Sequence, residues 1–292
     1  MKIIDSLITG FKRSLRAWKG VLISTSALLL VTSFFAKSLK TIIQNGFGSS
    51  LAPDELAHNF NFDLIIDLTR NIGGTGSIIP SDLFLVFFTG FVLTSFFSGG
   101  FFSYVKGEQF RFSIPNFFSA SAEYFWHFFA LSFIISMMIA FISFFLFAIF
   151  AGFGYFADPS GGQIIISIIA ILVLIIVMIL FLLIADYSRA CCVAQNKPGI
   201  FRAIGFGLKM TFGTFSTSVP MMLFLLIINI LLLWLMAELI NKIRPDSGFT
   251  VFLLFLLSQV LFFIRMWLRT WRYASITSLM ERRARNHATL DL

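Results

Sequence analysis

Residues 164–185 read IIISIIAILVLIIVMILFLLIA, an apolar run without one charged side chain. About 20 such residues in a helix span the roughly 30 Å hydrocarbon core of a bilayer, so this run predicts a transmembrane helix. The composition agrees, since 58% of the 292 residues are apolar and only 12% are charged. Soluble domains carry roughly 25% charged residues to cover their surface. The chain is therefore predicted to be an integral membrane protein and not a soluble one.

Five more apolar runs have the length of a membrane span. The six predicted spans cover residues 21–39, 83–102, 125–150, 164–185, 219–237 and 249–267. The sequence thus predicts an all-α, polytopic membrane protein with six transmembrane helices. The predicted segments are a cytoplasmic amphipathic helix (1–20), the first span (21–39), an extracytoplasmic loop domain (40–81), a membrane region of five spans (82–271) and a basic cytoplasmic tail (272–292).

The basic residues are distributed unevenly across these spans. The side that holds both termini carries 17 of the 22 Lys and Arg residues, and the other side carries Lys37, Lys40, Arg70, Lys242 and Arg244. Positive residues accumulate on the cytoplasmic side of membrane proteins, so both termini are expected in the cytoplasm. The sequence has no Asn-x-Ser/Thr acceptor, which suits a bacterial inner membrane. Topology and attraction to anionic headgroups explain the net charge of +8, so no nucleic-acid partner is expected.

Three stretches that lead into the first, third and fifth spans resemble one another. They are residues 7–19, 116–129 and 200–215, and each mixes aromatic, small and charged residues at helical spacing. In the first, Phe11, Leu15 and Trp18 share one face of a helix, which is expected to face acyl chains. This pattern predicts three copies of an interface helix, a span, an outer loop and a second span. The alternative is that any helix that enters a membrane carries aromatic and basic residues.

Several short motifs carry a resemblance to a known family. They are Gly99-Gly100 with Tyr104, Asn116-Phe117-Phe118, Tyr124-Phe125-Trp126, and Asp186-Tyr187-Ser188-Arg189. With them the chain from about Leu83 onward resembles a family of six-span bacterial inner-membrane proteins of uncharacterised function. Its layout is also similar to the membrane domain fused to some glycerophosphodiester phosphodiesterases. The resemblance implies a fold and a location, and it brings no catalytic residues.

Ionisable residues at the ends of spans are candidate functional residues, because a charge in lipid is costly. Asp186 closes the fourth span and is expected to pair with Arg189 or with an arginine of the sixth span. Arg265, Arg269 and Arg272 share one helix face and are a candidate site for lipid headgroups or phosphate. The alternative is that these arginines only extend to the interface and form ion pairs.

Other residues give weaker indications of a functional site. Glu123 and His127 lie four residues apart and form a possible proton-sensitive pair. In the outer loop, Asp63, Asp67 and Arg70 share a face that either holds a cation or is simply solvated. The adjacent Cys191 and Cys192 are expected to fill space at a helix end. No metal or cofactor is expected, and no catalytic residue is assigned, since three histidines on different segments offer no nucleophile triad.

The function expected from these features is non-enzymatic. The protein is predicted to be an accessory or scaffold component of the bacterial envelope that binds membrane lipids, mainly anionic ones, and other membrane proteins. The alternative is a transporter or permease-like subunit for an amphipathic or lipid-like solute. Most of the middle of the fourth and fifth spans is apolar, which is unusual for a polar conducting pathway.

Overall fold

Every described element of the chain is an α-helix. The computed structural model describes residues 2–47, 78–106, 112–156, 162–243 and 247–288. The helices are α1 (Lys2–Arg16), α2 (Trp18–Phe47), α5 (Ile78–Val105), α6 (Ile114–Phe156), α7 (Gly162–Ala194), α8 (Ile200–Gly213), α9 (Phe215–Lys242) and α10 (Gly248–Ala288). Each of the six predicted spans falls within one of these helices, which confirms the all-α membrane fold. Asp63, Asp67 and Arg70 of the predicted outer loop lie outside the described residues.

Five of the described helices, α5, α6, α7, α9 and α10, are each long and apolar enough to cross a membrane. The pair α1 and α2, which is bent at the break between Arg16 and Trp18, is a sixth candidate when it is counted as one span. The chain divides into two compact units. The first, which is described below, contains residues 1–21, 95–233 and 264–292, and the second contains residues 22–94 and 234–263.

The predicted interface helices are separate elements in two of the three places. α1 and α8 are distinct helices that precede α2 and α9, whereas residues 116–129 are continuous with the third span in the 43-residue helix α6. No Gly or Pro lies between Pro115 and Gly152, so nothing in the sequence interrupts the helix. At 1.5 Å per residue α6 is about 65 Å long, roughly twice the thickness of the hydrocarbon core.

The predicted C-terminal tail is also part of a helix. α10 continues without a break from the sixth span to Ala288, and Tyr273, Ala274, Ser275 and Ile276 are buried. The described part of the predicted tail, up to residue 288, is therefore helical and partly buried. The reason is that α10 has small residues along one face and packs there against α1.

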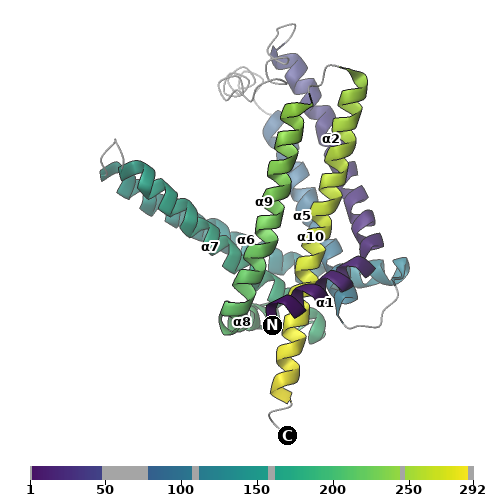
Figure 1. Cartoon of the computed structure of the whole chain (residues 1–292), viewed down its shortest axis with the longest axis vertical. Coiled ribbons are helices and arrows are strands. Elements are labelled where there is room, and N and C mark those ends of the chain that lie inside the picture. The colour runs from purple at the N-terminus through teal and green to yellow at the C-terminus, as the bar shows by residue number, and fades with distance from the viewer. Residues whose placement is uncertain (1, 48–77, 107–111, 157–161, 244–246, 289–292) are drawn as a thin grey trace. The chain divides into compact units, whose positions relative to one another are not determined.

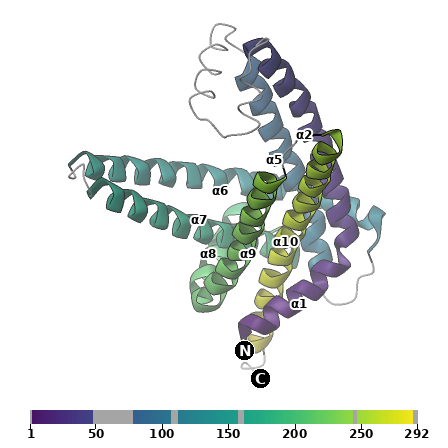
Figure 2. The same cartoon turned by 45° about the horizontal axis from the view of Figure 1, so that its top comes forward.

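α1 lies across α10 (Figures 1 and 2). Trp271 Nε1 donates a hydrogen bond of 2.9 Å to the Leu7 carbonyl, and Ser278 Oγ donates one of 3.3 Å to the Ser6 carbonyl. The ring of Phe11 packs edge-on against Trp267 and Trp271, at centroid distances of 5.2 and 5.0 Å. Phe11 therefore faces α10 and not acyl chains, contrary to the prediction.

The other two residues of the predicted face, Leu15 of α1 and Trp18 at the start of α2, are exposed. Ile4 and Ile8 extend the exposed apolar stripe along α1. The opposite face of α1 carries the buried Ser6, Gly10, Ser14 and Ala17, whose small side chains allow α10 to approach.

Glycines make the helices approach closely at three places. A Cβ atom at Gly10 of α1 would lie 2.7 Å from the Ser275 nitrogen of α10. A Cβ atom at Gly100 of α5 would lie 2.6 Å from the Phe117 ring of α6, and one at Gly207 of α8 would lie 2.6 Å from the Ile184 carbonyl of α7. Real Cβ atoms do not come this close, so each position requires glycine. Each contact joins a predicted interface helix to another helix: α1 to α10, α6 to α5 and α8 to α7.

The close contact at Gly207 gives a test with an internal control on the same helix. Gly207→Ala is expected to lower the free energy of unfolding by about 1–3 kcal/mol, because the new methyl group meets the α7 backbone. Gly205→Ala has nothing within 4 Å and is expected to stabilise by roughly 0.5–1 kcal/mol, through the better helix propensity of alanine. Thermal unfolding in detergent measures both. Equal effects of the two substitutions would contradict the close packing of α8 on α7.

Candidate functional site

Asp186 is the centre of a buried ion cluster at the end of α7. Its side chain is fully buried, and its two oxygens lie 3.2 Å from Arg189 Nη1 and 2.8 Å from Arg272 Nε of α10. The pair with Arg189 and the pair with an arginine of the sixth span, both expected from the sequence, are thus present together. An ionised carboxylate that is buried away from water is stable only when positive charges pair with it, as these two arginines do.

The same cluster extends to α6 and to further residues of α10. Arg189 Nη2 donates a hydrogen bond of 2.8 Å to Ser132 Oγ of α6, and Arg269 Nε donates one of 2.6 Å to the Tyr273 hydroxyl. The guanidinium of Arg272 lies 5.2 Å from the Tyr273 ring centroid, in a cation–π contact. The cluster therefore connects α6, α7 and α10, and its side chains are engaged with one another.

The three arginines predicted to bind a headgroup differ in their surroundings. Arg265 is exposed, whereas Arg269 and Arg272 both contact Tyr273, and Arg272 also pairs with Asp186. Their role in binding a headgroup stays a prediction.

The structure also places the other candidate residues of the membrane region. Glu123 Oε1 lies 3.1 Å from Lys197 Nζ, and within the described part of the chain it forms no ion pair with His127. The turn between α7 and α8 brings Lys197, with a φ of 66°, next to Glu123. Cys191 and Cys192 are both buried and free, in agreement with a space-filling role.

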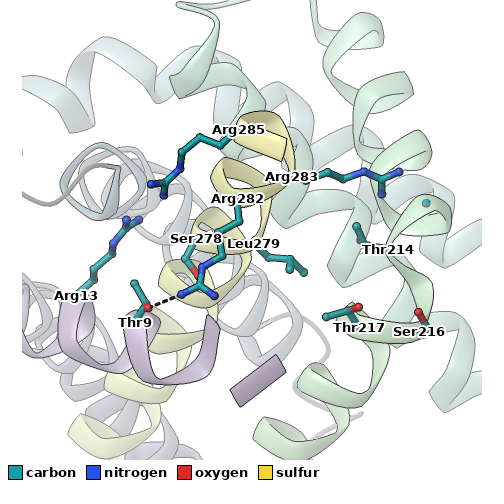
Figure 3. A pocket seen from close by; sticks show the side chains of 11 residues that line it. Thr9, Arg13, Thr214, Ser216, Thr217, Ser278, Leu279, Arg282, Arg283 and Arg285 are labelled. Carbon is teal, nitrogen blue, oxygen red and sulfur yellow. Dashed lines mark hydrogen bonds between the residues drawn. The ribbon is translucent and has the colours of Figure 1, made fainter. Parts of the chain in front are cut away.

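A polar cavity of about 640 Å³ lies among α1, the α8–α9 junction and the end of α10 (Figure 3). Four arginines and five hydroxyl side chains contribute to its lining, together with Gly213 and Leu279. The arginines are Arg13, Arg282, Arg283 and Arg285, and the hydroxyl residues are Thr9, Thr214, Ser216, Thr217 and Ser278. No carboxylate is among the lining residues that the structure describes.

Neighbouring groups hold two of these arginines in place. Arg13 Nη1 donates 3.0 Å to the carbonyl of Val105 at the end of α5, and Nη2 donates 2.9 Å to Glu281. Arg282 Nη2 donates 3.1 Å to the Thr9 hydroxyl, as Figure 3 shows. These contacts fix the guanidinium groups before any ligand arrives, which lowers the entropy that binding costs.

Two donors beside the cavity lack a hydrogen-bond partner. Arg13 is 6% exposed, and its Nε has no partner among the described residues; the same is true of the buried Nη1 of Arg283. Arg283 lies over Gly213, because a Cβ atom there would be 2.7 Å from Nη1. Buried donors of a charged group are expensive to leave unpaired, so an anion in the cavity is favoured.

The α8–α9 junction contributes hydroxyl groups to the cavity. Ser216 and Thr217 belong to the first turn of α9, and Thr214 Oγ1 lies 3.0 Å from the Tyr187 hydroxyl, which anchors the junction to α7. The N–H groups of Thr217 and Ser218 bond to the Thr214 carbonyl, so the side chains are the groups that this junction offers to a ligand. Arginines and hydroxyls together match the oxygens of a phosphate group.

Sequence reasoning placed these arginines in the basic ends of the chain without assigning them a site. The signal that was available is the run of small residues Ser6, Gly10 and Ser14, four residues apart in α1. Such spacing indicates a face for close helix packing. The face of α10 that carries Ser275 and Ser278 packs against these residues. Pairing the two faces would have predicted that both ends of the chain lie together.

Comparisons of the chain with family models, with curated proteins and with solved structures found no match to any of them. The resemblance to six-span inner-membrane proteins therefore stays a prediction.

The Asp186 cluster gives a prediction about stability. Asp186→Asn leaves Arg189 and Arg272 buried without a counter-charge, so a loss of about 3–5 kcal/mol in the free energy of unfolding is expected. Asp5→Asn is the matched control, since Asp5 forms an exposed 3.5 Å pair with Arg282 and should contribute roughly 0–1 kcal/mol. Denaturant titration in detergent micelles measures both. A loss for Asp186→Asn no larger than that of the control would overturn the structural role of the cluster.

Proposed function

We propose that the protein is a non-enzymatic accessory protein of the bacterial inner membrane that binds anionic lipid headgroups in the arginine-lined cavity. The observation that carries the proposal is the set of four arginines around about 640 Å³, with no carboxylate among the described lining residues. Phosphate is the anion that guanidinium groups and hydroxyls recognise best, through paired N–H donors and short charge-assisted hydrogen bonds.

The position of the cavity favours a lipid as the source of the phosphate. One wall is α1, whose exposed Ile4, Ile8 and Leu15 form a stripe suited to acyl chains. The arginines of α10 follow the sixth span, on the side where the distribution of Lys and Arg predicts the cytoplasm. A phospholipid bound there would place its phosphate among the arginines and its chains along the apolar stripe.

The hairpin of α6 and α7 supports a role in holding partners within the membrane. Phe144, Phe147, Phe153 and Ile164 are each more than 60% exposed, and the two helices run side by side (Figure 2). Lipid or another membrane protein covers such a surface in the membrane. In the proposed accessory role, the apolar hairpin contacts partners in the membrane and the cavity binds an anionic lipid.

One observation favours transport of a lipid-like solute as a second candidate function. A cavity of about 570 Å³ lies between α6 and α7, lined mainly by Leu, Ile, Phe and Ala, with Ser143, Gln163 and Ser167 among them. Transbilayer movement of a labelled lipid in vesicles that contain the protein distinguishes the two functions. A transporter accelerates it, and an accessory lipid-binding protein does not.

The proposed site predicts lipid-dependent stability. Phosphatidylglycerol added to delipidated protein in detergent should stabilise it by about 2.7 kcal/mol at a hundred times its dissociation constant, and phosphatidylcholine should not. The double variant Arg282→Gln/Arg283→Gln should lose this response, because both guanidinium groups leave the cavity. Thermal unfolding at increasing lipid concentration measures the effect.

The matched control for this experiment is the double variant Lys12→Gln/Arg265→Gln. It removes the same net charge from exposed positions outside the cavity lining. It should respond to phosphatidylglycerol like the unaltered protein. An equal loss of response in both double variants would show that only the general positive charge matters, and the cavity would be rejected as the site.

A further inference from the structure

The arginines of the cavity form two groups that reach toward different helices. Arg282 bonds to Thr9 of α1, where Arg13 also lies, whereas Arg283 lies over Gly213 at the α8–α9 junction. Figure 3 shows Arg283 extending away from the side of α10 that carries Arg282 and Arg285. We call these the α1 group (Arg13, Arg282 and Arg285) and the junction group (Arg283 with Ser216 and Thr217).

Helix geometry accounts for the separation. Consecutive residues of an α-helix leave its axis about 100° apart, so Arg282 and Arg283 diverge from neighbouring positions of α10. Each is then fixed by its own contact, Arg282 by the Thr9 hydroxyl at 3.1 Å and Arg283 by its close approach to Gly213. The two groups therefore reach the same cavity from different sides of α10.

Each group has a reason of its own to attract an anion. In the α1 group, the Nε of the buried Arg13 lacks a partner among the described residues. In the junction group, Nη1 of Arg283 is buried and also lacks one. Each group thus has a buried donor that a bound anion would satisfy.

The size of the cavity agrees with a ligand that reaches both groups. Its volume of about 640 Å³ lies in the range of small-molecule sites, roughly 300–1,000 Å³. Since a water molecule takes up about 30 Å³ of the liquid, a single phosphate would leave most of this space to solvent. The five hydroxyl side chains of the lining can bond to a polar linker between two phosphates.

We infer that the cavity binds a ligand with two separate phosphate groups, one in the α1 group and one in the junction group. This rests on the proposed function and names the ligand class of the same site. A membrane lipid whose headgroup joins two phosphodiesters through a glycerol has this chemistry, and so does a free glycerol bisphosphate. The membrane position of α1 makes the lipid the expected source.

The test compares ligands with one and with two phosphates on the delipidated full-length protein in detergent. The dissociation constants are obtained from thermal unfolding with cardiolipin, phosphatidylglycerol, soluble glycerol 1,3-bisphosphate and inorganic phosphate. Cardiolipin is expected to bind roughly tenfold or more tightly than phosphatidylglycerol, because its second phosphate gains charge-assisted hydrogen bonds of its own.

Variants assign the two phosphates to the two groups. Arg283→Gln should bring the affinity for cardiolipin down to that for phosphatidylglycerol and leave the latter largely unchanged. Arg283→Lys keeps the charge and should retain part of the preference, which guards against a variant that simply fails to fold. Lys12→Gln and Arg265→Gln, which change exposed residues outside the cavity, should leave both affinities as they are.

The outcomes separate the inference from the proposed function. Equal affinities for cardiolipin and phosphatidylglycerol, both weakened by Arg282→Gln/Arg283→Gln, would overturn the two-phosphate ligand and leave the anionic-lipid site standing. No effect of these arginines on any ligand would overturn both. Binding of glycerol bisphosphate as tightly as cardiolipin, and more tightly than phosphate, would support two phosphate positions and contradict the lipid as their source.

Discussion

The close approach of helices at glycine and serine residues is the contact on which the rest of the first unit depends. A Cβ atom at Gly10 would lie 2.7 Å from the Ser275 nitrogen, so α1 and α10 approach too closely there for a larger residue at position 10. In a bilayer, where apolar residues gain little by leaving lipid for protein, such packing and interhelical hydrogen bonds drive association. The contact brings Arg13 and Thr9 beside Arg282, so the arginine-lined cavity exists only because α1 is held there.

Charge is arranged around this packing in two different ways. At Asp186 the arginines pair with a buried carboxylate and connect α6, α7 and α10. At the cavity four arginines line a space that has no carboxylate among its described lining residues. Buried donors without a hydrogen-bond partner among the described residues occur in both places, such as Nε of Arg189 at the cluster and Nε of Arg13 at the cavity. The cavity has room for a ligand that supplies the missing oxygens.

The class of fold could be predicted from the sequence, because apolar runs such as residues 164–185 have one physical solution in a membrane. Helix continuity was harder to predict. Residues 116–129 look like a separate interface helix, but without Gly or Pro they continue into α6.

The Asp186 pairs were predictable because a carboxylate at the end of a span needs a cation, and arginines occur nearby in the sequence and on the sixth span. The cavity could not be predicted, because it depends on contacts between residues more than 260 positions apart, as between Thr9 and Arg282. Periodicity within one helix places Arg265, Arg269 and Arg272 on one face, yet it says nothing about what covers that face.

The most direct test of the central claim is native mass spectrometry of the unaltered protein released gently from its membrane. The account predicts that one anionic phospholipid remains bound after the zwitterionic lipids have dissociated, because it is held by guanidinium groups inside the cavity. A protein that loses anionic and zwitterionic lipids at the same collision energy would contradict the account.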